Sequence, residues 1–411
     1  MPINDRADDG SAAASRPATD IAGHLAGSDA PERTRVRIGY LPLTDCAPIV
    51  MAPVLGFDVR RGVAIEPVRL NSWASLRDQL LAGAIDLAHV LHGLVVGLQV
   101  GLGGPRHGMA VLMVLSRNGQ AITLSRRMAD RGLGDAASLA RAVGAAEQPP
   151  TFAQTFPTGT HAMWLYHWLA SAGVHPLRDA RIVTVPPPQM VRAMGQGQVD
   201  GFSAGEPWNH RAVLDGVGVT AATSQQVWPD HPEKVLGCTA EFADRHPHTC
   251  RAVVQAVLEA GRWIDAGTDH RSVTAERLSR PEHLDTPVGA ILPRMLGRYQ
   301  DGRGRSWDDA HPMAFHGDGA VNFPYLSDAM WFLTQYRRWG LLAEHPDYER
   351  TARALHRLDL YREAAQGVAV PVPASPLRSS RLIDGSPWDG SNPAAYADGF
   401  ALHARTAPAC T

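Results

Sequence analysis

The sequence predicts an α/β protein of two lobes with a ligand cleft between them. Strand-like apolar runs alternate with segments of helical periodicity over residues 35–117, and a similar alternation returns over residues 140–208. Such alternation is typical of a largely parallel sheet layered with helices. Two such units in one chain predict two lobes. Ligands of these folds bind outside the carboxyl ends of the strands, where helix N-termini converge.

The first unit begins at residues 35–43, "RVRIGYLPL", where charged and apolar residues alternate before Gly/Pro punctuation, as in a strand. Residues 71–83 form an amphipathic helical pattern with Trp73 on the apolar face and Gly83 as its stop. The other predicted elements are a helix and turn at 45–62, a strand at 63–70, a strand and helix at 84–101, and an apolar strand at 108–117.

The second unit is predicted to begin with a short strand at 140–146, followed by the helix that carries His161. A strand at 180–187, a helix at 187–198 that opens on prolines, and a strand and loop at 199–208 follow. Further predictions are a helix over 240–265 after a His-Pro start, helices over 320–362, and an irregular Pro/Ser-rich segment from 366 onward.

These elements predict the domain organisation. Lobe 1 comprises 35–120 and 240–345, and lobe 2 comprises 121–239, with a hinge near Gln120 and Gly237. Residues 1–34 are predicted to be a flexible N-terminal tail, and 346–411 a C-terminal extension that packs back on the lobes.

Composition excludes several classes of function. The 411-residue chain is 45% hydrophobic and 19% charged, with a formal net charge of -2, so it has no basic stripe for direct nucleic-acid binding. No apolar run approaches the roughly 18 residues of a membrane span. Residues 1–34 lack the apolar region of a secretory signal. With Met1 as the start, we expect a cytoplasmic protein that contacts no membrane.

Motifs of catalysis and cofactor binding are absent. The sequence contains no nucleotide-binding glycine pattern, no GxSxG elbow and no HExxH. We therefore expect neither an enzyme nor a cofactor. His89 and His92, and the histidines of "DRHPHTC" at 244–250, leave metal binding open, although an exposed helix start is the favoured interpretation of the second segment.

The stretch "FPTGTHAMWLYHWL" at 156–169 puts His161 in the first turn of a predicted helix, after Gly159 and Thr160. The start of a helix exposes unpaired N–H groups and the positive end of its dipole, so it can hold an anion. The alternative is that His161 only caps or packs the helix. Trp164 and Trp168 are expected to lie in the core.

Four other residues stand at predicted element ends. Each has a structural alternative: core packing for Trp73, a hairpin turn for Gln120, a solvated loop for Lys234, and a turn for Glu206. An indole, an amide, an imidazole and an ammonium together would suit a small planar anion such as nitrate or nitrite. Spacing alone does not bring them together.

Seven segments, in order, resemble the nitrate- and bicarbonate-binding proteins of bacterial ABC transporters. The most specific motifs are "TFPTGTH", "PPPQMV", "GEPW" and "HPEK", and the resemblance covers roughly 35–400. It implies the two-lobed type II periplasmic-binding-protein fold. It also implies that Trp73, Gln120, His161 and Lys234 hold the anion, with Gly159 and Thr160 beside them. Glu206 is less certain, because bicarbonate-binding relatives are expected to recruit a cation there.

The N-terminal segment departs from the transporter-linked pattern, which carries a signal and a lipid-anchored cysteine. With neither feature, the sequence resembles the NasS-like sensors, whose partner is a NasT-like RNA-binding antiterminator. We therefore expect a nitrate/nitrite sensor that sequesters this partner when empty and releases it on anion binding, controlling nitrate assimilation genes. One alternative is the substrate-binding component of a nitrate or bicarbonate ABC transporter. A second is an enzyme of the thiamine-precursor-synthase branch of the fold.

Overall fold

The computed structural model describes residues 29–143 and 148–404. The first of its two large sheets contains β1 (Arg35–Tyr40), β2 (Ala64–Arg69), β3 (Leu87–Leu91), β4 (Met109–Val114) and β10 (Lys234–Thr239). Their order is β2-β1-β3-β10-β4. β1 pairs in parallel with β2 and β3, whereas β10 runs antiparallel to both β3 and β4. In this sheet only β10 is reversed.

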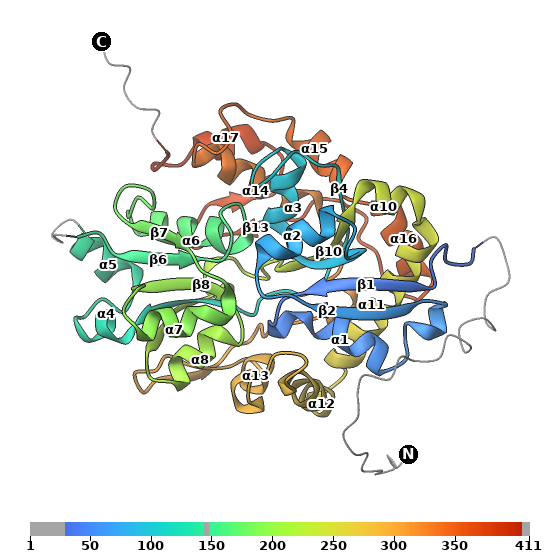
Figure 1. The fold of residues 1–411 in the computed structure, drawn as a ribbon. Coiled ribbons are helices and arrows are strands. Elements are labelled where there is room, and N and C mark those ends of the chain that lie inside the picture. Colours follow the sequence, from blue (N-terminus) through green and yellow to red (C-terminus); the bar gives the residue numbers. More distant parts are fainter. Residues whose placement is uncertain (1–28, 144–147, 405–411) are drawn as a thin grey trace.

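The second sheet repeats this plan. It contains β5 (Gln120–Ser125), β6 (Thr151–Gln154), β7 (Arg181–Thr184), β8 (Gly201–Gly205) and β9 (Gly218–Thr223), in the order β7-β6-β8-β5-β9. β6 is parallel to β7 and β8, and β5 is antiparallel to β8 and β9. Figure 1 shows the two sheets side by side, which confirms the predicted two-lobed α/β architecture.

The helices surround these sheets. Those that follow the first-sheet strands are η2 (Thr44–Cys46), α1 (Ala47–Val54), η3 (Val59–Arg61), α2 (Trp73–Leu81), α3 (His92–Gln99), α10 (Ala240–Arg245), α11 (Pro247–Asp265) and α12 (Thr268–Ser279). Those of the second lobe are α4 (Arg126–Asp130), α5 (Ala136–Val143), α6 (Thr160–Ser171), η4 (Pro187–Gln189), α7 (Met190–Gly195), α8 (Trp208–Leu214) and α9 (Ser224–Val227).

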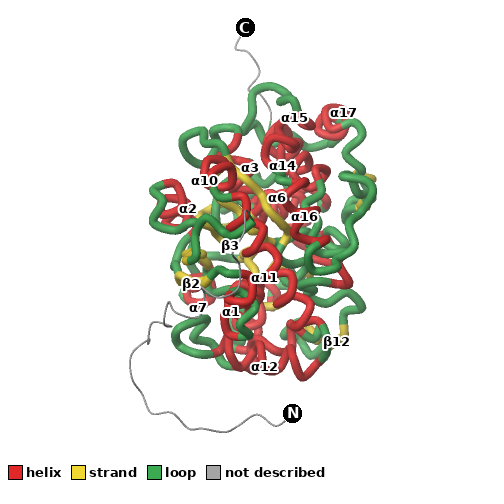
Figure 2. Tube along the Cα trace, turned by 90° about the vertical axis from the view of Figure 1, so that its right-hand side faces the viewer, coloured by secondary structure: helices red, strands yellow, loops and turns green. Residues whose placement is uncertain are grey.

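The remaining chain forms smaller elements that run along both lobes. They are α13 (Val288–Met295), β11 (Arg298–Gln300), β12 (Ser306–Asp308), η5 (Gly317–Gly319), α14 (Leu326–Arg338), α15 (Tyr348–Leu355), α16 (Leu358–Gln366), β13 (Ser380–Arg381), β14 (Pro387–Trp388) and α17 (Pro393–Asp398). Figure 2 shows α14, α15 and α17 at one end of the molecule and α12 at the other, with strands between them.

The reversed strands bring particular residues to the contact between the lobes. The forward strands β1, β3, β6 and β8 end at this contact, whereas β5 and β10 begin there. Gln120 is the first residue of β5 and Lys234 is the first residue of β10. Both side chains therefore lie at the same edge as the segments that follow the carboxyl ends of the forward strands.

Two crossing segments join the lobes and run beside each other. Leu115 N donates to Lys234 O over 2.7 Å, Asn118 N to His231 O over 2.9 Å, and Glu233 N to Ser116 O over 3.0 Å. The second crossing thus precedes Lys234, and the predicted crossing near Gly237 is wrong because Gly237 lies inside β10. β10 belongs to the first sheet, although the predicted boundary of lobe 2, residues 121–239, placed it in the second lobe.

Asn118 and Gly119 do not form the hairpin that their dipeptide allows. Both have positive φ, 59° and 82°, so they make a sharp turn. The strands that they join, β4 and β5, belong to different sheets. This turn therefore serves the crossing, and Gln120 is a strand residue.

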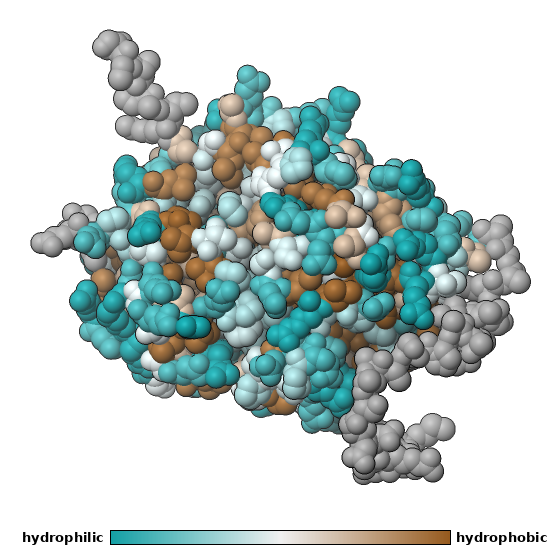
Figure 3. Space-filling model, in the orientation of Figure 1, coloured by the Kyte–Doolittle hydropathy of each residue, from teal (hydrophilic) through white to brown (hydrophobic). Residues whose placement is uncertain are grey.

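A continuous apolar core extends through both lobes. It includes Val90 and Val235 from the first sheet and Ile122 and Phe152 from the second, and all four are completely buried. The lobes are thus packed against each other. Among the described residues, no helix combines the length and apolar character needed to cross a membrane. The surface in Figure 3 mixes hydrophilic and hydrophobic residues without segregating them.

Three further sequence predictions need correction. Residues 140–146 were expected to form a strand, but Ala136–Val143 is helix α5, in keeping with the high helix propensity of its alanines; 144–147 lie outside the described residues. The strand that precedes the His161 helix is instead β6. Part of the segment 240–345 lies on the second lobe, because Thr220 N donates to Asp301 O over 3.1 Å beside β11.

The third correction concerns the predicted N-terminal tail over 1–34, of which 1–28 lie outside the described residues. Glu32 is bound to the N-terminus of α11. Its carboxylate accepts hydrogen bonds from His248 N (3.0 Å), Thr249 N (2.8 Å) and Thr249 Oγ1 (2.8 Å). A carboxylate at a helix N-terminus satisfies orphan N–H groups and interacts favourably with the helix dipole.

Replacing this cap is expected to destabilise the fold. Glu32→Ala should lower the free energy of unfolding by about 1–2 kcal/mol, because it removes an N-terminal cap. The measurement is urea unfolding of purified protein. Glu241→Ala is the matched control, since Glu241 makes an exposed i,i+4 pair with Arg245 and contributes little. Equal stability of the two variants would show that the 29–33 segment does not stabilise α11.

Candidate functional site

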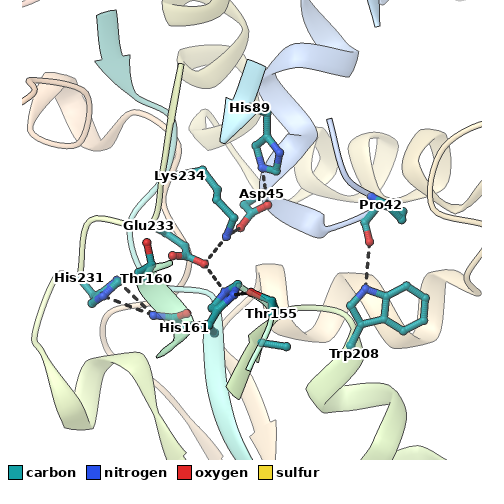
Figure 4. Close-up of polar contacts among 12 residues, drawn as sticks. Pro42, Asp45, His89, Thr155, Thr160, His161, Trp208, His231, Glu233 and Lys234 are labelled. Atoms are coloured by element: carbon teal, nitrogen blue, oxygen red, sulfur yellow. Dashed lines mark hydrogen bonds and ion pairs between the residues drawn. The ribbon is translucent and has the colours of Figure 1, made fainter. Parts of the chain in front are cut away.

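The ammonium group of Lys234 lies between two carboxylates where the lobes meet. Its Nζ is 2.8 Å from Asp45 Oδ2, and it also donates to Glu233 Oε1. Asp45 follows β1 in η2, so it comes from a different part of the chain. All three side chains are completely buried. Figure 4 shows them as one connected chain of polar contacts.

The mutual attraction of these groups overcomes the cost of burying them. Burial alone would lower the pKa of Lys234, but Asp45 and Glu233 raise it above its ordinary value. Burial likewise opposes ionisation of Asp45 and Glu233, yet Lys234 lowers the pKa of both carboxyl groups. The cluster therefore contains one ammonium and two carboxylates at neutral pH.

His161 extends the cluster into the second lobe. Its Nε2 lies 3.0 Å from Glu233 Oε1, and its Nδ1 lies 2.6 Å from Thr155 Oγ1. Burial lowers the pKa of His161 in spite of the nearby Glu233 carboxylate, so the ring is neutral. A neutral ring carries one N–H. Because the Glu233 carboxylate can only accept, that proton is on Nε2 and Nδ1 accepts from the Thr155 hydroxyl.

His89 and Trp73 complete the cluster on the first lobe. His89 Nε2 lies 2.7 Å from Asp45 Oδ1. Trp73 is placed at the start of α2 by the cap of Ser72, whose Oγ accepts from Ser75 N over 3.1 Å. The Lys234 ammonium lies 5.6 Å from the centre of the indole ring, within the range of a cation–π interaction. Trp73 therefore both packs in the core and faces the charge.

Gln120 stands at the edge of this group. Its backbone pairs with Gly205 of β8. A Cβ atom added to Gly205 would lie 3.7 Å from Lys234 Nζ, so this strand pair runs close to the ammonium. Its Nε2 is 3.4 Å from both ring nitrogens of His231, a long contact. Burial lowers the pKa of His231 to about 3, so this ring is neutral and can accept the amide proton.

Glu206 has a different partner. Its Oε1 forms a buried ion pair with Arg294 Nε of α13 at 3.2 Å, and its Oε2 accepts from His210 N over 3.0 Å. Burial raises the pKa of Glu206, against the effect of Arg294. Its backbone carbonyl accepts from Thr44 N of η2 over 2.8 Å. Glu206 is thus a link between segments, apart from the Lys234 cluster.

Gly159 and Thr160 lie where the backbones of the two lobes approach each other. A Cβ on Gly159 would lie 2.7 Å from Leu91 Cδ1, and one on Gly93 would lie 2.5 Å from Thr158 O. Gly93 N is 3.5 Å from Thr160 Oγ1. Only glycine permits such contact. These residues therefore bring the start of α6 against the first lobe.

Several buried polar atoms of this region lack a partner among the described residues. They are Trp73 Nε1, Gln120 Oε1, Glu233 Oε2, His89 Nδ1 and Thr44 Oγ1. Buried polar groups are nearly always hydrogen-bonded, and an unmade bond costs about 1–3 kcal/mol. Their concentration around one ammonium is typical of a site that binds a small polar ligand.

Sequence reasoning missed Asp45, Thr155 and Glu233, and it considered His89 only as a possible metal ligand. Asp45 and Thr155 each follow the carboxyl end of a strand, where the ends of parallel strands converge, so position could have revealed them. Glu233 adjoins Lys234 in the chain. Within the described residues, no set of three or more His, Cys, Asp or Glu side chains is arranged to hold a metal ion.

Comparison with known proteins shows relatives over most of the chain. The profile of the NMT1-like family matches residues 29–279. The chain is 36% identical to the nitrate/nitrite binding protein NrtA of Synechocystis over 388 residues, which cover 92% of this chain and 87% of that protein. It is 30% identical to the bicarbonate-binding protein CmpA of Synechococcus over 395 residues, covering 90% of this chain and 87% of CmpA.

The crystal structure of the periplasmic nitrate-binding protein NrtA from Synechocystis shares the fold. It superposes with a TM-score of 0.87 at 35% identity, covering 91% of this chain and all (100%) of that one. The fold is therefore the two-lobed periplasmic-binding-protein fold. Both NrtA and CmpA are named as binding proteins, not as enzymes.

The cluster predicts a large stability effect at Lys234. Lys234→Ala should lower the free energy of unfolding by about 3–5 kcal/mol, because it leaves two buried carboxylates without their cation. The control combines Lys234→Met with Asp45→Asn and Glu233→Gln, which removes all three charges and should recover much of the loss. Urea unfolding at neutral pH measures both. A single variant as stable as the unmodified protein would show that the ion pairs do not form.

Proposed function

The chain belongs to the NMT1-like family, and from that premise we propose that it binds nitrate or nitrite at the Lys234 cluster between its lobes. The observation that carries the proposal is the burial of three side chains from both lobes: the Lys234 ammonium faces the Trp73 ring and shares the Glu233 carboxylate with His161. Gln120 lies at the edge of this group. No catalytic step is part of the proposal, since binding alone is the activity.

The chemistry of the side chains supports a planar monoanion. Nitrate accepts hydrogen bonds at its edges and has a flat face. Trp73 offers an unpartnered Nε1–H and an aromatic surface, and Lys234 offers a full positive charge. A charge-assisted hydrogen bond contributes about 1.5–3 kcal/mol, so the ammonium would supply the largest share of affinity.

Bicarbonate is the second candidate ligand, and one observation favours it. Glu233 Oε2 and Gln120 Oε1 are buried acceptors without partners among the described residues. Bicarbonate carries a hydroxyl that could donate to one of them, whereas nitrate and nitrite carry no donor. The CmpA relative is also named as bicarbonate-binding.

We further propose that the protein is a cytoplasmic sensor whose occupancy is read by a NasT-like antiterminator. Residues from both lobes surround the proposed ligand, so binding would favour one arrangement of the lobes. The affinity of a partner that contacts both lobes would then rise or fall when the anion binds. The alternative is the substrate-binding component of a nitrate ABC transporter, which would bind the same anion. The names of the NrtA relatives fit that alternative as well as they fit the sensor.

The ligand proposal predicts the result of a calorimetric titration. The purified protein should bind nitrate or nitrite, with chloride as the reference anion. Trp73→Phe keeps the ring but removes the indole N–H, so affinity should fall about two- to tenfold. Trp339→Phe is the matched control, because it also removes a buried, unpartnered indole N–H, in this case at the end of α14. Equal affinities of the two variants would exclude Trp73 from the site.

The sensor proposal predicts ligand-dependent dissociation. The protein and its antiterminator partner should co-elute in size exclusion without anion and separate when nitrate or nitrite is saturating. By linkage, the partner should weaken anion affinity by the same factor as the anion weakens partner affinity. Co-elution that is unchanged at saturating anion would contradict the sensor and leave the transporter component as the better account.

A further inference from the structure

The proton that His161 could offer a ligand is already donated to Glu233. The ring is neutral, and its single N–H, on Nε2, lies 3.0 Å from Glu233 Oε1. Its other nitrogen accepts from Thr155. His161 can therefore donate to an anion from this position only after Glu233 has moved away.

Glu233 also resembles the proposed ligand in shape and charge. Its Oε1 accepts from both His161 Nε2 and Lys234 Nζ, while its Oε2 has no partner among the described residues. A carboxylate is a planar monoanion with oxygens about a trigonal centre, as nitrate and nitrite are with nitrogen. Glu233 thus occupies the two donors that an entering anion needs.

Charge makes coexistence of the two anions costly. Asp45 and Glu233 are ionised beside the single ammonium of Lys234, so the three groups sum to -2 + 1 = -1. A bound monoanion would bring the sum to -2 in a completely buried space.

We propose that Glu233 is a specificity-determining residue that competes with the ligand for His161 and Lys234, and that a monoanion displaces it with uptake of one proton. This inference rests on the proposed function. The proton comes from water or buffer and forms an O–H bond on the displaced Glu233 carboxylate. The charge of the cluster then stays at -1, because anion and proton enter together.

The groups that face Glu233 identify it as the proton acceptor. They are Lys234 of β10, Asp45 of η2, His161 of α6 and His231 of the crossing segment. Asp45 keeps Lys234 and His89 as partners. His231 stays neutral, since burial lowers its pKa to about 3. Glu233 alone loses both its donors to the ligand, so its ionised form loses the interactions that stabilised it.

Proton uptake would determine which anions bind. A monoanion enters with one proton at no net change in charge. A dianion such as sulfate would need a second proton to keep the charge constant, and that proton would have to enter a group other than Glu233 against the burial that holds His161 and His231 neutral. The competition by Glu233 therefore selects for monoanions, and it makes binding weaken as pH rises.

Calorimetric titration of the intact protein with sodium nitrate and sodium nitrite tests the proposal. Repeating each titration in buffers of different ionisation enthalpy counts the protons exchanged. We expect uptake of about one proton per anion and a dissociation constant that rises about tenfold per pH unit above neutrality. Binding without proton exchange would overturn the competition but leave the proposed function intact. Absence of binding by both anions would overturn both.

Two variants assign the proton to its residue. Glu233→Gln removes the ionisable competitor, so binding should no longer take up a proton and should not depend on pH. Asp45→Asn also removes one negative charge from the same ammonium but leaves Glu233 on His161 and Lys234. The anion must still take both donors from Glu233, so proton uptake should persist there if displacement of Glu233, and not the net charge of the cluster, is its cause. Uptake that continues in Glu233→Gln, or that is lost equally in both variants, would show that Glu233 does not occupy the ligand's place.

Discussion

The buried contact of Lys234 with Asp45 and Glu233 is the interaction on which the site depends. It joins two segments of the chain at the meeting point of the lobes, and it keeps one ammonium charged where burial alone would favour the neutral amine. Breaking such a pair costs more than the pair contributes, since the remaining charges stay buried. The arrangement therefore keeps one ammonium charged between two carboxylates, of which Glu233 alone is proposed to give way to an anion.

Topology explains how distant residues reach this contact. In each sheet one strand is reversed, and that strand begins where the forward strands end. Lys234 and Gln120 are the first residues of the two reversed strands, whereas Asp45 and Thr155 follow forward strands. The two crossing segments pair with each other beside them. The same backbone thus forms both the connection between the lobes and one wall of the candidate site.

Much of the fold was predictable because strand and helix periodicities are local. Trp73 and His161 could be placed at helix starts for the same reason. The strand predicted at 140–146 failed, since a short apolar run also fits a helix, and the crossing predicted near Gly237 failed because strand order is non-local. Motif resemblance singled out Lys234, but its neutralisation by Asp45 cannot be inferred across 189 residues. Glu206 likewise carried no local sign of its pairing with Arg294.

A crystal structure of the protein grown with nitrate tests the central claim most directly. The account predicts a planar anion within hydrogen-bonding distance of Trp73 Nε1, His161 Nε2 and Lys234 Nζ, with the Glu233 carboxyl turned away from His161. Asp45 should remain on Lys234. Nitrate bound elsewhere, or bound while Glu233 still accepts from His161, would contradict it.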